Sequence, residues 1–266
     1  MLELVIFSIV MIIIVILFTI GFEPQPTLPF IDPIDDNTFP FHVFIINLDR
    51  KPERYKYVTN QLDSMGITEY TRISGTDGFK ADRKDIEAAG VSPVLYNKGK
   101  GVAGCAASHV RVWKHIADND LDWCLILEDD AHFHPDFKKL FSKYWNQVPS
   151  NAMMIYPGYC SAIETTDTPV LRNAVMCLQG YMISAKGARH LLNNLLPIIV
   201  SVDVAIEKHF MLRNDSYVFN GNAEIDGIRP FNYKESNDKK CMFNGIIYQN
   251  RGEYGSIIHE IDMVLE

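Results

Sequence analysis

Three carboxylate side chains, Glu128, Asp129 and Asp130, stand together in the segment LDWCLILEDDAHFHPDF, residues 121–137. The apolar run WCLIL that precedes them has the length and composition of a buried strand. Mg²⁺ and Mn²⁺ prefer carboxylate oxygens, and a bound cation cancels the repulsion between adjacent acids. We therefore expect a divalent metal site here, with Glu128 and Asp130 as the nearer ligands because side chains alternate along an extended segment. Three solvated turn residues before a helix are the alternative.

Other residues have chemistry but a less specific pattern. Arg50 and Arg54 follow an apolar strand and could clamp a diphosphate, although taken alone they are better explained as exposed charges at a helix start. Asp203 lies among apolar residues at another helix start, where it is either a cap or a catalytic carboxylate. His132 and His134 remain unassigned, since two histidines in a loop are more often solvated than metal-bound.

The segment GKGVAGC, residues 99–105, is a glycine-bearing loop that matches no phosphate-binding motif. It lacks the lysine and hydroxyl spacing of a Walker loop and the acid that follows a dinucleotide fingerprint. Ser108 and His109 come next, but adjacent helix positions point in different directions, so we do not expect a hydrolase pair.

Apolar runs alternate with helical patterns from residue 41 onward. The predicted strands are residues 41–48, 69–74, 123–127 and 152–156 and the pair 174–178 and 180–184, and the predicted helices are 49–66, 82–90, 106–117, 134–145, 186–197 and 202–214. This alternation indicates an α/β fold, Rossmann-like, with a mostly parallel sheet flanked by helices. Ligands of such sheets bind outside the carboxyl ends of the strands, where the segments NLDRKPER, SGTDG and EDD fall.

The N-terminal segment predicts a membrane anchor. Residues 4–22 carry no charge and, at about 1.5 Å per helical residue, would span roughly the hydrocarbon layer of a bilayer. We expect an anchor over residues 1–23, preceding the α/β domain, a stiff Pro-rich stalk over 24–40 and one folded domain over 41–266. A cleaved signal peptide is the less favoured alternative. The short head before the span suggests that the domain faces a lumen or periplasm.

The net charge of −8 argues against nucleic acid as a partner. The five cysteines contain no CxxC pair, so a structural zinc site is not expected.

Together these motifs resemble glycosyltransferase family 25, which includes lipooligosaccharide and procollagen galactosyltransferases. The similarity covers roughly residues 41–210 and rests on FIINLDRKPER, SGTDG, GVAGCAASHVRVW, CLILEDDAHFHPDF, GYMISAKGARHLL and VDVAI. It implies a GT-A fold and inverting transfer of a hexose from a UDP-sugar, most often UDP-galactose. It also implies a metal site at Glu128, Asp129 and Asp130 for Mn²⁺ or Mg²⁺. The donor-binding positions that we associate with it are Asn47, Asp49, Arg50, Arg54, Asp77, Gly104, Ser108 and His109.

Inversion requires one group to take the acceptor's proton, and Asp203 is our candidate for the catalytic base or for holding the acceptor. The expected partners are the nucleotide-sugar donor, a glycan, lipid-linked saccharide or protein acceptor, and the membrane through the N-terminal helix. The domain would be lumenal, in the ER or Golgi, in a eukaryote and membrane-associated in a virus or bacterium. A catalytically silent binding or adhesion module on the same fold is the alternative. A nucleotidyltransferase is less favoured, because NLDRKPER lacks the glycine-rich loop that such enzymes carry near the first strand.

Overall fold

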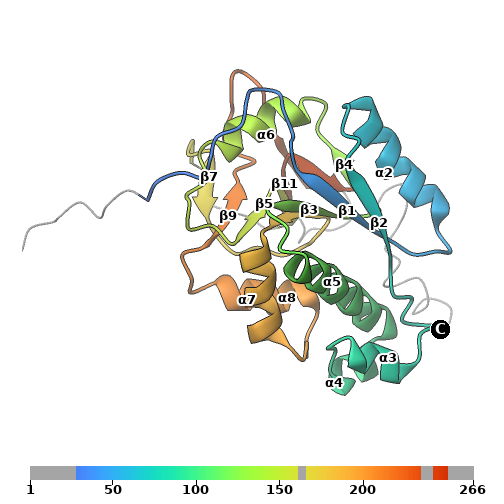
Figure 1. Ribbon diagram of the computed structural model, residues 1–266. Coiled ribbons are helices and arrows are strands. Elements are labelled where there is room, and N and C mark those ends of the chain that lie inside the picture. Colours follow the sequence, from blue (N-terminus) through green and yellow to red (C-terminus); the bar gives the residue numbers. More distant parts are fainter. Residues whose placement is uncertain (1–27, 161–165, 235–241, 251–266) are drawn as a thin grey trace, which may run out of the picture.

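A seven-stranded sheet forms the centre of the computed structural model, which describes residues 28–160, 166–234 and 242–250 (Figure 1). The strand order is β2 (Tyr70–Ser74), β1 (His42–Asn47), β3 (Cys124–Glu128), β8 (Gly180–Ile183), β5 (Met154–Tyr156), β9 (Ser216–Phe219) and β7 (Val170–Arg172). Five strands run in one direction, whereas β8 and β7 run in the other.

The expectation of a mostly parallel sheet therefore needs correction: three of the six strand pairings are parallel and three are antiparallel. A return to a parallel neighbour requires a long crossover, usually a helix. The described part of the connection from β5 to β8 contains short strands and no helix, so β8 enters antiparallel between β3 and β5.

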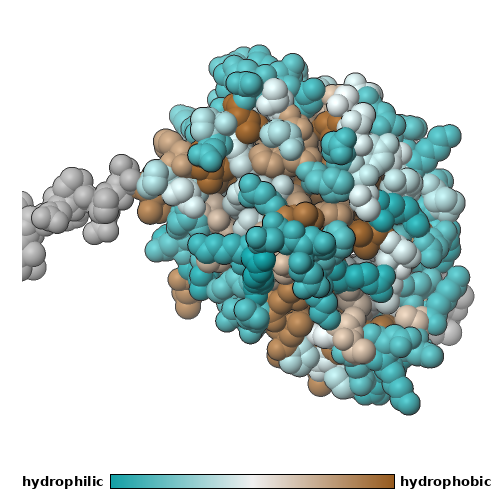
Figure 2. All heavy atoms as spheres, viewed as in Figure 1, coloured by the Kyte–Doolittle hydropathy of each residue, from teal (hydrophilic) through white to brown (hydrophobic). Residues whose placement is uncertain are grey.

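Helices cover both faces of the sheet (Figure 1). On one face α2 (Pro52–Ser64) and α6 (Phe137–Trp145) pack over an apolar cluster that includes Ile45 and Leu127. On the other, α5 (Lys100–Asp118), α7 (Ala185–Leu195) and α8 (Val202–Phe210) enclose Phe44 and Ile126. Alternate side chains of β1 and β3 therefore pack into two apolar cores, one on each face of the sheet, as expected for buried central strands. Two short helices, α3 (Arg83–Ala88) and α4 (Pro93–Lys98), lie beside α5. The face of the molecule viewed in Figure 2 is mostly hydrophilic, with scattered apolar residues.

The predicted glycine-bearing loop is helical instead. α5 begins at Lys100, so Gly101 and Gly104 lie in its first turns. A side chain at Gly104 would place a Cβ only 2.4 Å from the Thr76 carbonyl oxygen, and one at Gly78 would lie 1.8 Å from that of Lys100. The absence of side chains at Gly78 and Gly104 therefore lets the loop after β2 pack closely against the start of α5. Loop flexibility is not the reason for glycine at these positions.

Two smaller sheets bring the C-terminal part of the described chain back to the domain. β12 (Ile247–Gln249) pairs with β4 (Ala131–Phe133), directly after the three acids. β11 (Met242–Gly245) lies between β10 (Phe231–Lys234) and β6 (Gly158–Cys160). The strand predicted at residues 174–178 is absent. The backbone at Cys177 has φ 70°, in the left-handed region, which a strand does not tolerate.

Residues 28–40 lie against α6 and its C-terminal turn, so the expectation of an unpacked stalk is wrong for this part of the chain. The amide of Ile31 donates to the Val148 carbonyl at 2.9 Å, and Trp145 Nε1 donates to the Asp32 carbonyl at 3.0 Å. The Phe39 ring packs edge-on against a phenylalanine of α6, with ring centroids 4.8 Å apart. Burial of these apolar side chains outweighs the extended preference of the prolines.

The predicted anchor over residues 1–23 lies outside the described residues. Within the described ranges, no helix has the length and apolar character needed to cross a bilayer.

Candidate functional site

A pocket opens at the edge of the sheet where β1, β2 and β3 end. The three strands are parallel, and their register sets Asn47 beside Ser74 and Ile46 beside Glu128. Its lining comes from the ends of these strands, the loop after β2, the start of α5 and β12: Ile46, Leu48, Arg50, Arg54, Gly75, Thr76, Asp77, Gly78, Phe79, Gly101, Cys105, Ser108, His109, Glu128, Asp129, Asp130 and Gln249. The segments NLDRKPER, SGTDG and EDD meet at this edge of the sheet, as the sequence led us to expect.

Arg54 holds two of the three acids. Its side chain is 2% exposed, and Nε lies 3.1 Å from Asp129 Oδ1 while one terminal nitrogen lies 3.0 Å from Asp130 Oδ2. Asn47 Nδ2 donates to the other oxygen of Asp129 at 2.7 Å. Both oxygens of Asp129 are therefore engaged by protein groups, and Arg54 is turned toward the acids from α2.

Asp130 keeps one oxygen without a protein partner among the described residues. Its Oδ2 accepts from Arg54 and from Gln249 Nε2, the latter at 2.8 Å, but the buried Oδ1 has no hydrogen-bond donor. Burial raises the pKa of Asp130 to about 7, and the Glu128 charge adds to this rise. Burial also raises the pKa of Asp129, against the opposing effect of Arg54. An orphaned, buried carboxylate oxygen is the group that a cation would satisfy.

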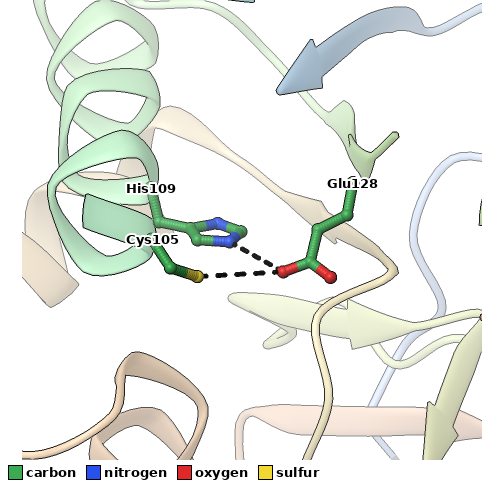
Figure 3. A group of neighbouring side chains, drawn as sticks. All are labelled: Cys105, His109 and Glu128. Carbon is green, nitrogen blue, oxygen red and sulfur yellow. Dashed lines mark hydrogen bonds and ion pairs between the residues drawn. The ribbon is translucent and has the colours of Figure 1, made fainter. Parts of the chain in front are cut away.

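Glu128 faces α5 across the pocket (Figure 3). His109 Nε2 lies 3.4 Å and Cys105 Sγ lies 4.0 Å from Glu128 Oε1. Cys105 and His109 are four residues apart on α5 and so project from the same face of the helix. Burial, followed by the Glu128 charge, raises the pKa of the Cys105 thiol well above its ordinary value. The Glu128 side chain keeps 25% of its surface exposed.

The loop after β2 forms the opposite wall. Arg50 Nε donates to Asp77 Oδ2 at 2.9 Å, and both residues line the pocket. Ser108 Oγ accepts from the Thr76 amide at 2.8 Å and donates to the Gly104 carbonyl, so it fixes this loop to α5. Of the predicted donor-binding residues, this places Arg50, Arg54, Asp77, Ser108 and His109 around one cavity, with Asn47 and Gly104 directly behind its lining.

Four sequence candidates lie apart from the pocket. Asp49 is exposed and pairs with Arg72 at 2.6 Å. Asp203 stands in the first turn of α8, where its Oδ1 accepts from the following amide at 2.8 Å, and it does not line the pocket. His134 donates to the Arg229 carbonyl and accepts from the Asp136 amide, while His132 contacts Tyr57, so both histidines make structural contacts.

Three contributors to the site had no sequence prediction. Gln249 arrives from β12 far along the chain, and no local pattern signalled it. Cys105 lies in the family-like segment GVAGCAASHVRVW but had no assigned role, although its i, i+4 spacing with His109 is a readable signal. Tyr181 on β8 contacts His109 Nδ1 at 3.0 Å from behind the pocket.

The fold and the pocket define an α/β protein with three acidic side chains at the end of a central strand, and the comparisons with known proteins give the family. The model for "Glycosyltransferase family 25 (LPS biosynthesis protein)" matches residues 41–206, more than half of the chain. The chain therefore belongs to glycosyltransferase family 25.

Several relatives support this assignment. A protein of Acanthamoeba polyphaga mimivirus named "Putative glycosyltransferase" is 35% identical over 136 residues, which cover 47% of this chain and 40% of the relative. A glycosyltransferase 25 family member of Drosophila pseudoobscura pseudoobscura is 27% identical over 191 residues, 63% of this chain and 30% of the relative. Procollagen galactosyltransferase 1-B of Xenopus laevis is 26% identical over 191 residues, 63% of this chain and 31% of the relative. The matched parts thus span less than half the length of these relatives.

Proposed function

We propose that this protein is a metal-dependent, inverting hexosyltransferase that transfers a hexose from a UDP-sugar to an acceptor hydroxyl. The hexose that we propose is galactose. The observation that carries the proposal is the buried Oδ1 of Asp130, which has no hydrogen-bond partner among the described residues, beside the partly exposed Glu128 in the pocket of a family 25 chain. A galactosyl donor is chosen because relatives are named procollagen galactosyltransferases.

The donor set fits Mn²⁺ or Mg²⁺. Asp130 and Glu128 would hold the ion directly, since each retains carboxylate capacity toward the pocket, whereas both oxygens of Asp129 are taken by Arg54 and Asn47. When bound, the cation would neutralise the diphosphate of the donor as it leaves. Asp129 would support the site from behind by keeping Arg54 in place.

The protein's own residues would orient the donor. Arg50 lines the pocket and keeps 26% of its side chain exposed, so it can turn from Asp77 toward a phosphate oxygen. Arg54 is too enclosed by the acids for that role, so we assign it to holding Asp129 and Asp130. Asp77 and Ser108 would shape the wall that receives the nucleoside.

We retain Asp203 as the proposed base. It lies near enough to the pocket that its charge contributes, after burial and Glu128, to the raised pKa of Cys105. In the proposed reaction this carboxylate would take the proton of the acceptor hydroxyl. The acceptor itself is proposed as a glycan, a lipid-linked saccharide or a protein hydroxyl. A membrane-anchored domain, lumenal in a eukaryotic cell, remains part of the proposal.

The test uses the full chain in detergent with UDP-galactose and other UDP-hexoses. Slow release of UDP in the presence of Mn²⁺ is expected, together with loss of that release in Asp130→Asn. Asp118→Asn, an exposed acid at the end of α5, is the matched control and should behave as the unmodified chain. UDP binding with no turnover of any UDP-hexose or acceptor would favour the silent binding module. Absence of both UDP binding and a response to Mn²⁺ would refute both functions.

A further inference from the structure

Cys105, His109 and Glu128 form a cluster that the proposed transferase mechanism does not use as a unit (Figure 3). One ligand atom from each residue lies within 4.8 Å of the others. Thiolate, imidazole and carboxylate together are a borderline-soft donor set, which suits Zn²⁺ and Co²⁺ better than Mg²⁺ or Mn²⁺. We propose that these three side chains constitute a Zn²⁺ site, separate in ligand type from the Mn²⁺ or Mg²⁺ site but sharing Glu128 with it.

The spacing of the ligand atoms is close to that of a tetrahedral zinc site. With zinc bonds of roughly 2.0–2.3 Å, neighbouring ligand atoms of a tetrahedron are about 3.3–3.8 Å apart. The distance from Glu128 Oε1 to His109 Nε2 is 3.4 Å and that to Cys105 Sγ is 4.0 Å. The third pair, Cys105 Sγ and His109 Nε2, lies within 4.8 Å, so the three ligand atoms are close enough for side-chain rotations to bring them toward one ion.

The imidazole is held in position from behind. His109 is 1% exposed, and its Nδ1 lies 3.0 Å from the Tyr181 hydroxyl, which in turn accepts a hydrogen bond from Trp113 Nε1 at 2.8 Å. Nε2 consequently points at Glu128. A hydrogen bond to the second ring nitrogen is the usual support of a metal-bound histidine.

The site is open on one side. All three residues line the pocket, so the fourth zinc position faces the cavity and can take water or a ligand. Closed structural zinc sites have four protein ligands, whereas three protein ligands and one open position characterise sites that exchange ligands. On binding, the Cys105 thiol would release its proton to solvent. If the proposed function is correct, Zn²⁺ at this site would also compete for Glu128 with the donor-site cation.

The experiment uses Co²⁺ as the spectroscopic probe on the full chain, under reducing conditions. One equivalent of Co²⁺ should give the visible bands of a four-coordinate ion and a thiolate charge-transfer band, both removed by one equivalent of Zn²⁺. Cys105→Ser should lose the charge-transfer band, while Cys177→Ser, which changes a partly buried cysteine outside the pocket, should keep it. Tyr181→Phe should weaken Zn²⁺ binding about 10- to 100-fold with the bands retained. No charge-transfer band in the unmodified chain, or a band that survives Cys105→Ser, would overturn the proposal.

Two further measurements keep the zinc site distinct from the donor site. Asp130→Asn should lose the response to Mn²⁺ and keep the Co²⁺ bands. Loss of the donor-site cation can therefore be observed separately from loss of the zinc site. If Cys105→Ser does not fold, alkylation of the unmodified chain decides the matter: bound Zn²⁺ should slow modification of Cys105 and leave that of Cys177 unchanged. Equal alkylation of Cys105 with and without Zn²⁺ would refute the site.

Discussion

Binding of Mn²⁺ should depend on pH through Asp130. Burial, followed by the Glu128 charge, raises the pKa of this carboxyl to about 7 in the folded, metal-free protein. An acid whose folded pKa lies above its unfolded value stabilises the fold below the unfolded pKa, and this contribution is lost as pH rises through the folded pKa. The metal-free protein should therefore become less stable between about pH 4 and about pH 7.

A bound cation offsets this loss of stability, because it binds the ionised form of the Asp130 carboxylate. With a pKa of about 7, roughly a tenth of Asp130 is ionised at pH 6 and roughly nine tenths at pH 8. The apparent affinity for Mn²⁺ should consequently rise about tenfold from pH 6 to pH 8. About one proton should be released for each ion bound at pH 6, and almost none at pH 8.

Isothermal titration of the full chain with MnCl₂, in two buffers of different ionisation enthalpy, measures both quantities. Asp130→Asn should abolish binding and make the metal-free protein more stable at pH 8 than the unmodified chain, because a buried charge is removed. Asp118→Asn should retain the affinity and the proton release. An Mn²⁺ affinity that stays constant from pH 6 to pH 8 in the unmodified chain would refute the reasoning.

Three substitutions, two of them with a matched control, test how the site and its surroundings are held together. Arg54→Ala should lower the free energy of unfolding in urea by about 3–5 kcal/mol, because it leaves two buried acids without their arginine partner. A loss under about 1 kcal/mol would contradict this role. Gly104→Ala should lower the free energy of unfolding by about 1–3 kcal/mol and weaken UDP binding. Gly99→Ala, whose added Cβ would have its nearest neighbour 3.5 Å away, should do neither, and equal effects of the two substitutions would contradict the close-packing argument. Phe39→Ala should lower the unfolding free energy by about 2 kcal/mol and Phe30→Ala, at an exposed ring, by less than about 0.5 kcal/mol; no difference between them would show that residues 28–40 contribute little.

Local patterns predicted the elements well where burial and periodicity agree. The helix predicted over residues 106–117 lies within α5, and the face shared by Ala106, Val110, Trp113 and Ala117 is buried, because a helix face is decided by spacing within a few residues. The direction of β8 was not predictable in the same way, since the strand is apolar throughout and its pairing depends on a long connection. The helical start of α5 was missed because glycine suggests a loop, and its neighbour in space, the loop after β2, lies some twenty residues earlier.

The candidate site shows the same division between local and distant information. The grouping of the acids at a strand end followed from WCLIL and EDD alone, but the position of Arg54 did not. Its place after the first strand indicated an exposed charge at a helix start, and the family resemblance implied a donor-binding role. In the fold, α2 turns it inward onto Asp129, and Gln249 reaches Asp130 from the far end of the described chain. Neither contact leaves a signal in neighbouring residues.

The charge arrangement explains why the site would select a divalent ion. Ionised Glu128, Asp129 and Asp130 carry three negative charges, and the enclosed Arg54 supplies one permanent positive charge, so a net charge of about −2 faces the pocket. A divalent cation balances this charge fully, whereas a single lysine or sodium ion would leave one charge uncompensated in a buried setting. In the proposed function, such a cation would enter with the diphosphate and leave with it. Arg54 would limit the number of charges that this ion has to neutralise, so replacement of Arg54 should alter metal preference as well as stability.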